Sequence, residues 1–165
     1  TLPEIWNLRI NNGRRAWNVV GVFNWSSLRR TRTIVPHEMD IVMEPGEQLA
    51  AYDFWQERLL AVTNGFIDVH LPPRSCRVIG LVPVNVREPA LISSSRHITQ
   101  GALDVTGVGY DPETFTLSGR STPVEGHAYE LRLYVPVGEN GLTLDTVEAG
   151  LDHQELIVTR PDTLG

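Results

Sequence analysis

The stretch Leu59-Leu60-Ala61-Val62-Thr63-Asn64-Gly65-Phe66-Ile67-Asp68-Val69-His70-Leu71 decides the fold class. Apolar and polar residues alternate after Asn64-Gly65, and a period of two is typical of a half-buried β-strand. Asn-Gly is a strong local signal for a β-hairpin. Strands joined by so short a connection cannot be parallel neighbours, because a parallel return needs a crossover of about a dozen residues or more. The stretch therefore predicts two antiparallel strands, over 59–63 and 66–71, joined as a hairpin.

The same alternation recurs along the chain, bounded by Gly, Pro, Asn and Asp, and helical periodicity is nearly missing. Further strands are expected at 5–10, 16–23, 38–42, 48–53, 76–82, 90–94, 102–110, 114–118, 128–135, 142–147 and 155–159. The sequence thus predicts an all-β fold, an antiparallel β-sandwich of about 12 strands. The last strands are expected to add an extra sheet layer or a lobe.

Length and composition favour one folding unit. The 165 residues are 41% hydrophobic, which is ordinary for a globular protein. Two prolines fall within 83–89, which offers an alternative division into 1–82 and 90–165. Each half would have about 80 residues and only a marginal core. We therefore expect 1–165 to form a single β-sandwich unit.

Charge and cysteine content exclude several classes of partner and site. The formal net charge is −6 and the isoelectric point is near 5.3, which argues against a nucleic-acid or anionic-membrane surface. The basic run at 29–32 is expected to be a solvated loop, and the alternative is a contact with an anion or a partner. Cys76 is the single cysteine, so no disulfide can form within the chain. No stretch reaches the roughly 18 apolar residues of a membrane span. Because the chain begins with Thr1, we expect a processed or excised piece of a longer protein.

Motifs for catalysis and metal binding are missing from the sequence. Asp and Glu are dispersed over turns and strands, and no Ser/His/Asp set is signalled. The histidines are widely spaced, without a metal-ligand pattern, at positions 37, 70, 97, 127 and 153. We therefore expect no catalytic residue, no metal site and no cofactor in this chain. Calcium binding through Asp111 and Glu113, or through Asp145 and Glu148, is the alternative that the sequence leaves open.

Four tryptophans raise the question of carbohydrate contact, since sugars stack on flat aromatic rings. In Tyr52-Asp53-Phe54-Trp55, strand alternation places Asp53 and Trp55 on the face opposite Tyr52 and Phe54. Trp25 and Trp55 stand at strand ends beside polar residues, so they are the candidates for exposure. Together with Asp53, they are the candidates for contact with carbohydrate or with another domain; the alternative is that they lie at the edge of the core. The aromatic residues expected in the core are Trp17, Phe23 and Phe54.

The run from Ser93 to Gly101 is dense in polar side chains. Arg96, His97 and Gln100 supply guanidinium, imidazole and amide groups within a short distance. Buried polar groups must find partners, because an unsatisfied one costs about 1–3 kcal/mol. Two interpretations remain open: a structural network, or a ligand pocket formed by these three residues.

Four motifs in this order carry a resemblance to a known family. They are Val22-Phe23-Asn24-Trp25, Tyr52-Asp53-Phe54-Trp55, Leu71 to Ile79, and Arg96-His97-Ile98-Thr99-Gln100-Gly101. Together they resemble the C-terminal β-sandwich that follows the catalytic barrel in α-galactosidase-like (melibiase-like) glycoside hydrolases. The likeness covers 6–119 and continues more weakly to 136.

This resemblance implies a non-catalytic accessory domain whose partner is an upstream catalytic barrel of the same polypeptide. The family's catalytic aspartates lie on that barrel, so none is assigned to this chain. Two alternatives stay open. One is an autonomous carbohydrate-binding module that uses Trp25 and Trp55. The other is a protein-interaction sandwich, in which an edge strand or an apolar patch meets a partner.

Overall fold

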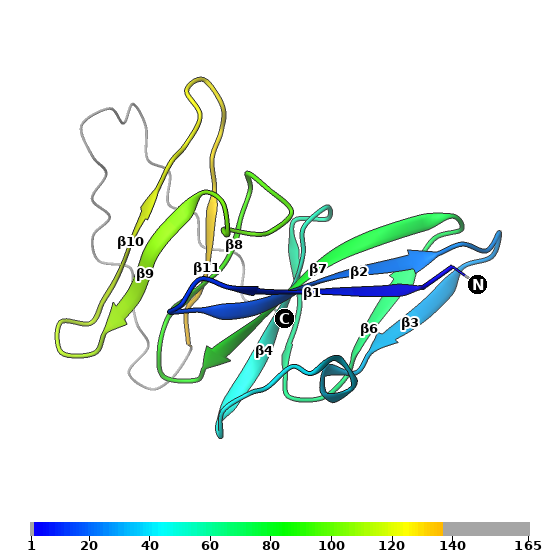
Figure 1. The fold of residues 1–165 in the computed structure, drawn as a ribbon, viewed down its shortest axis with the longest axis horizontal. Helices are drawn as coiled ribbons and strands as arrows, with labels where there is room; N and C mark the ends of the chain where they lie inside the picture. Colours follow the sequence, from blue (N-terminus) through cyan, green and yellow to red (C-terminus); the bar gives the residue numbers. More distant parts are fainter. Residues whose placement is uncertain (1, 137–165) are drawn as a thin grey trace.

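The computed structural model describes residues 2–136, and in this range the chain is an all-β antiparallel sandwich (Figure 1). Its strands are β1 (Ile5–Asn11), β2 (Ala16–Asn24), β3 (Arg30–Ile34), β4 (Glu47–Asp53), β5 (Arg58–Thr63), β6 (Ile67–Leu71), β7 (Ser75–Asn85), β8 (Ala90–Ser94), β9 (Val105–Asp111), β10 (Thr116–Ser121) and β11 (Leu131–Tyr134). The predicted fold class is confirmed. The strands expected at 142–147 and 155–159 lie outside the described residues.

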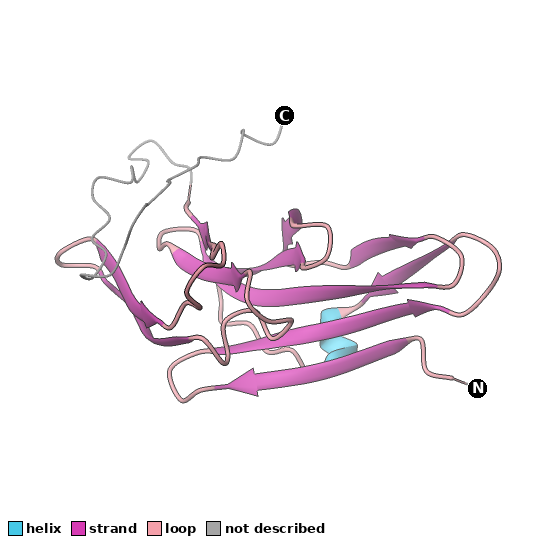
Figure 2. Cartoon of the chain, turned by 90° about the horizontal axis from the view of Figure 1, so that it is seen from above, coloured by secondary structure: helices cyan, strands magenta, loops and turns pink. Residues whose placement is uncertain are grey.

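A five-stranded sheet in the order β1-β2-β7-β4-β5 is the centre of the molecule. Every neighbouring pair in it is antiparallel. The long strand β7 lies in the middle and pairs with β2 on one side and β4 on the other. Figure 2 shows these long strands side by side, with β1 starting beside the N-terminus. The other strands form three two-stranded sheets, β3-β6, β8-β11 and β9-β10.

One face of the central sheet is covered by β3 and β6. Alternate residues of the two layers meet in a buried cluster, because strand side chains alternate between faces. The cluster comprises Val20, Val22, Ile34, Ile41, Leu49, Ala51, Ile67, Val69, Leu71, Ile79 and Leu81. Within the described residues, this is the main interface between the two layers of the sandwich.

The opposite face of the same strands has a second buried cluster. Its members are Trp17, Val19, Ala50, Tyr52, Val82, Val84 and Ile92. Ile92 belongs to β8, and Tyr134 of β11 packs against the cluster, so the β8-β11 sheet covers this part of the face. Figure 1 shows β8 to β11 gathered at one end of the central sheet, and β3 and β6 toward the other.

The hairpin predicted at Asn64-Gly65 is wrong. β5 pairs with β4 in the central sheet, whereas β6 pairs with β3 in the other layer. The turn therefore leads the chain from one layer to the other. A two-residue hairpin of the expected type needs a positive φ at both central residues, and neither Asn64 nor Gly65 has one. Burial decides the pairing, because Ile67, Val69 and Leu71 all face the cluster between the layers.

Two other local predictions are corrected. The basic run expected as a loop at 29–32 enters strand β3, where Arg32 forms an ion pair with Glu4 and Ile34 is fully buried. The strand expected at 38–42 is a short 3₁₀ helix, Pro36–Met39, which starts with proline and ends at Asp40 with a positive φ of 54°. Among residues 2–136, no helix has the length and apolar character needed to span a membrane.

Candidate functional site

The second face of the central sheet is only partly covered, and its uncovered part is the candidate site. Along β2, alternation places Trp17, Gly21 and Phe23 on this face, and the next position in the series is Trp25. Trp17 is 1% exposed beneath the β8-β11 side, whereas Trp25 is 48% exposed. We call the uncovered part the aromatic end; its residues are Trp6, Phe23, Trp25, Phe54, Cys76 and Val78.

The rings of Phe23 and Trp25 form a flat pair at this end. They are stacked, with centroids 5.0 Å apart and planes 5° from parallel. A Cβ at Gly21 would lie 3.0 Å from the Phe23 ring, so the glycine leaves room for that ring over the sheet. The Trp25 indole Nε1 donates to the Pro3 carbonyl at 2.9 Å. The segment that precedes β1 therefore fixes the position of the Trp25 ring through this hydrogen bond.

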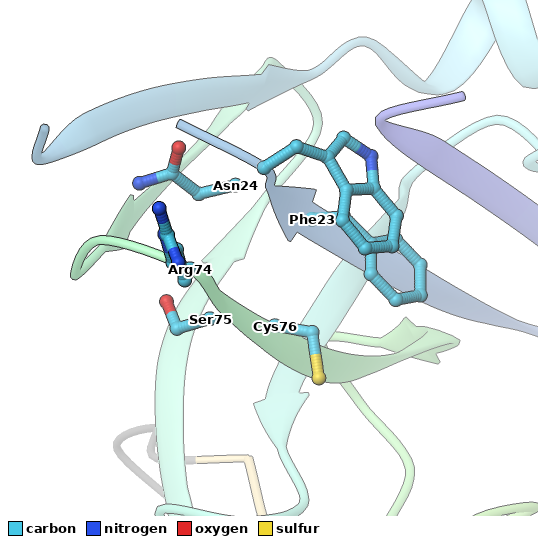
Figure 3. A pocket seen from close by; sticks show the side chains of 6 residues that line it. Phe23, Asn24, Arg74, Ser75 and Cys76 are labelled. Carbon is cyan, nitrogen blue, oxygen red and sulfur yellow. The ribbon is translucent and has the colours of Figure 1, made fainter. Parts of the chain in front are cut away.

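An open pocket of about 420 Å³ adjoins the ring pair (Figure 3). It is lined by Phe23, Asn24, Trp25, Arg74, Ser75 and Cys76. Arg74 stands in the β6-β7 turn with a positive φ of 49°, and its N–H donates to the Ser26 carbonyl at 3.0 Å. The site is therefore formed where the β2-β3 loop touches the β6-β7 turn.

Much of the polar lining of this pocket is engaged in holding the loops together. The buried Asn24 amide donates to the Leu28 carbonyl at 2.8 Å and to the Pro72 carbonyl at 2.7 Å. Its carbonyl accepts hydrogen bonds from Ser26, and Ser75 Oγ donates to Pro72 at 2.7 Å. The remaining polar groups, those of Arg74 and Cys76, are exposed. A ligand would thus meet mainly aromatic surface, one guanidinium and one thiol.

Two of the residues predicted from the sequence lie apart from this pocket. Asp53 is 1% exposed and is held on the other side of the sheet, where its carboxylate accepts from the Gln56 N–H at 3.0 Å and lies 3.4 Å from Arg77 Nε. Trp55 is 59% exposed and contacts Phe54 edge to face, but it does not line the pocket. The structure therefore exposes both Trp25 and Trp55 without joining them in this pocket.

The predicted set of Arg96, His97 and Gln100 is also divided. Arg96 and His97 are exposed; Arg96 donates to the Thr122 carbonyl, and His97 Nδ1 lies 3.0 Å from Thr99 Oγ1. Gln100 is fully buried, with a positive φ of 55°, and its amide lies against Gly80 in the central sheet. The three side chains therefore do not meet at one surface. Their segment instead caps the covered part of the sheet.

One other buried carboxylate lies near this capping segment. Asp104 is 2% exposed and accepts a hydrogen bond from the Tyr129 hydroxyl at 2.8 Å. Burial, and next the hydrogen bond to Asp104, raise the pKa of Tyr129. Within residues 2–136, no three His, Cys, Asp or Glu side chains gather as a metal site would require. The buried acids Asp53 and Asp104 thus each have structural partners.

The sequence missed most of the aromatic end. Phe23 and Phe54 were expected in the core, yet both are partly exposed; only Trp17 is confirmed as core. No pattern in the sequence points to Trp6 or Cys76 as site residues. The even spacing between Trp17 and Trp25 indicates that both side chains lie on one face of a strand. Predicting the whole site also requires the order of the strands in the sheet. That order places β1 and β7 on either side of β2.

Comparisons with family profiles and with curated proteins each return no match. Comparison with solved structures returns glycoside hydrolases of the α-galactosidase-like class. One is described as an α-N-acetylgalactosaminidase from Bacillus halodurans, with a TM-score of 0.40 and 20% identity, covering 48% of this chain and 18% of that one. Another is α-galactosidase I from Mortierella vinacea, with a TM-score of 0.39 and 13% identity, covering 49% and 21%. This chain therefore matches only about a fifth of each enzyme, and TM-scores this low do not bear on its activity.

Proposed function

We propose that this chain is a non-catalytic accessory β-sandwich of a glycoside-hydrolase-like protein, and that its aromatic end packs against a separate catalytic barrel preceding Thr1. The observation that carries the proposal is the uncovered apolar part of a sheet face whose other part is buried. Trp6 and Trp25 are 59% and 48% exposed there. Contiguous exposed apolar surface of this kind marks an interface in soluble proteins.

The position of the N-terminal segment supports the same proposal. The Glu4 backbone carbonyl accepts a hydrogen bond from the Phe23 N–H at 2.7 Å, and the Pro3 carbonyl accepts one from the Trp25 indole N–H. A domain joined ahead of this segment would start beside the aromatic end. A short tether raises the effective concentration of the two surfaces, so even a weak contact between them would be populated.

The chemistry of the aromatic end favours a protein surface over a sugar as its occupant. Recognition of sugar hydroxyls needs several free amides or carboxylates around the stacking ring. Asn24 and Ser75 bind backbone carbonyls of the chain itself. A protein surface needs only apolar cover, with an acidic group opposite Arg74.

The non-catalytic part of the proposal is tested with the purified chain. Assay against aryl galactosides, aryl N-acetylgalactosaminides and other aryl glycosides should give no turnover above buffer. Hydrolysis that copurifies with the chain and disappears in a variant of one of its own carboxylates would overturn this part. Asp53→Asn and Asp104→Asn are the variants to compare, because these two acids are buried.

The docking part is tested in the parent polypeptide. The coding region ahead of Thr1 is expressed together with this chain, and unfolding is followed by calorimetry. We expect one cooperative transition for the native sequence and two for a Phe23→Ser, Trp25→Ser variant, because docked domains unfold together. Phe66→Ser is the matched control, since Phe66 is 68% exposed in the β5-β6 connection, away from this end. Two transitions for the native sequence would contradict docking.

A carbohydrate-binding module is the second candidate, favoured by the exposed indole of Trp25 beside an open pocket. Titration of the chain with galactosides, glucans and mannans, followed by tryptophan fluorescence, separates it from the docking proposal. Saturable binding that is lost in Trp25→Ala and kept in Trp55→Ala would establish a sugar site at the pocket. The docking proposal expects no saturation with any of these sugars.

A further inference from the structure

We propose that two copies of this chain pair through strand β1, antiparallel and centred on Leu8, so that the two central sheets form one continuous sheet. In residues 2–136, β1 is an outer strand of the central sheet (Figure 2). An outer strand presents a row of N–H and C=O groups that a further strand can use. The proposal goes beyond the proposed function, because it concerns the edge of the sheet and a second copy of this chain; Trp6 is the residue common to β1 and the aromatic end.

The hydrogen bonds at the two ends of β1 show which backbone groups point outward. Phe23 N–H donates to the Glu4 carbonyl, and Asn12 N–H donates to the Arg15 carbonyl. Even-numbered positions of β1 therefore bond to β2, and odd-numbered positions turn their backbone groups to the other side. The outward positions are Ile5, Asn7, Arg9 and Asn11.

β1 lacks the features that commonly protect an edge strand. Its seven residues, IWNLRIN, contain no proline and no lysine, and Arg9 is the single charge. Its pairing with β2 runs through all seven residues without a bulge. The outer strand on the opposite side, β5, is shorter and has a bulge in its pairing with β4 near Tyr52. β1 is thus the straighter and more regular edge.

The sequence of β1 is complementary to itself in the register centred on Leu8. Leu8 then faces Leu8 of the second copy, and Trp6 faces Ile10, so apolar residues meet on one face. On the other face Asn7 meets Arg9, and like charges are never opposed. Asn7 and Arg9 both turn their backbone groups outward, so this register also joins donors to acceptors. It pairs all seven residues of both strands.

The exposed apolar area on β1 argues for a weak dimer. Trp6 and Leu8 are 59% and 55% exposed, and pairing would place each beside an apolar side chain of the other copy and reduce its exposure. An interface built from one strand a side falls below the roughly 1,200 Å² of stable complexes. We therefore expect a dissociation constant of about 1–100 μM.

The association is tested by sedimentation equilibrium of the native chain over a range of concentrations. Leu8→Lys places two cations opposite each other only in the dimer. We therefore expect this variant to raise the dissociation constant of the dimer at least tenfold. Leu28→Lys is the matched control, because Leu28 is 60% exposed in the β2-β3 loop. It should dimerise like the native chain. Circular dichroism and urea midpoints show whether both variants fold. A native chain that stays monomeric up to about 1 mM, or equal dimerisation of the two variants, would overturn the proposal.

The register is tested by cross-linking in a Cys76→Ser background. Leu8→Cys places the two thiols opposite each other at a pair without backbone hydrogen bonds, where Cβ atoms lie about 4.5 Å apart, close to what a disulfide needs. Mild oxidation should cross-link this variant rapidly and Leu28→Cys slowly. Equal rates would contradict the register. Dimerisation that depends on Trp25 and is indifferent to position 8 would show that the aromatic end, and not β1, joins the copies.

Discussion

Trp17 and Trp25 lie on one face of one strand and its immediate continuation, yet their surroundings are opposite. Trp17 is 1% exposed, donates from Nε1 to the Thr99 carbonyl at 3.1 Å, and lies under the Arg15 guanidinium. Trp25 is 48% exposed, with Phe23 as its ring neighbour. The difference comes from the layer above the sheet, because the segments from β8 to β11 cover one part of this face and leave the other open.

This comparison shows that side chains of the covered part are packed under a second layer, as in a protein core, whereas those of the open part are not. At the covered part, Tyr52 is buried and lies under the guanidinium of Arg132 from β11, which in turn forms ion pairs with Glu57 and Glu130. At the open part lies Phe54, which comes two residues after Tyr52, directly beyond the end of β4. Its side chain is only partly buried. An apolar surface left in this condition is what a second protein layer would complete.

The largest difference should appear when the two tryptophans are shortened. Trp17→Ala should cost about 3–5 kcal/mol of unfolding free energy, because it removes a fully buried ring and leaves a cavity. Trp25→Ala should cost about 1 kcal/mol, mostly from the lost stack with Phe23. Urea unfolding followed by circular dichroism measures both. Equal losses would mean that the open part is as much a core as the covered one.

The docking proposal predicts a further difference between these two variants, measured in a longer polypeptide that includes the coding region ahead of Thr1. If the aromatic end is docked there, the cost of Trp25→Ala should rise toward that of Trp17→Ala, since Trp25 would then be buried as well. Trp17→Ala should cost the same in both settings.

A second difference, smaller than the first, concerns two glycines on this face. A Cβ at Gly80 would lie 2.5 Å from the amide of Gln100, which is fully buried, so the amide can move only by displacing packed neighbours. A Cβ at Gly21 would lie 3.0 Å from the edge of the partly exposed Phe23 ring, which can shift. Gly80→Ala should therefore destabilise by about 1–3 kcal/mol and Gly21→Ala by less than about 1 kcal/mol.

The double variant Gly80→Ala, Gln100→Ala checks the cause. Removing the Gln100 amide should recover most of the cost of the added methyl group, which appears as coupling in a double-mutant cycle. Additive costs would contradict the contact and place the strain elsewhere. Urea midpoints of the four proteins are the measurement.

The sequence predicted the elements of this fold better than their partners. Alternation located β1, β2, β4 and β8 within a few residues, because a half-buried strand needs apolar residues on one side only. It failed at Asn64-Gly65, since the pairing of β5 and β6 depends on which layer buries Ile67 and not on the turn itself. Strand β3 was missed because its apolar residue Ile34 comes at the end of a basic run.

The aromatic end could be predicted only in part, for a related reason. The exposure expected for Trp25 and Trp55 is confirmed, because strand ends beside polar residues are seldom covered. The contributions of Trp6 and Cys76 depend on β1 and β7 flanking β2, and no local pattern encodes that order. The burial of Gln100 depends likewise on the absence of a side chain at Gly80, which lies twenty positions earlier in the chain.

The smallest expected difference is in the response to alkaline pH, and it arises from Tyr52 at the covered part. Burial raises the pKa of Tyr52 to about 12, above the usual value near 10. Between these two pH values the unfolded chain loses the tyrosine proton while the folded chain keeps it, so ionisation favours unfolding. The stability contributed by Tyr52 is thus complete below about pH 10 and declines as the pH rises toward 12. Tyr52→Phe should flatten the fall in unfolding free energy over this range, measured by urea titration at successive pH values, and adding Tyr129→Phe should flatten it further. An unchanged slope in Tyr52→Phe would mean that β11 does not shield this ring from solvent, and the covered part would then resemble the open one.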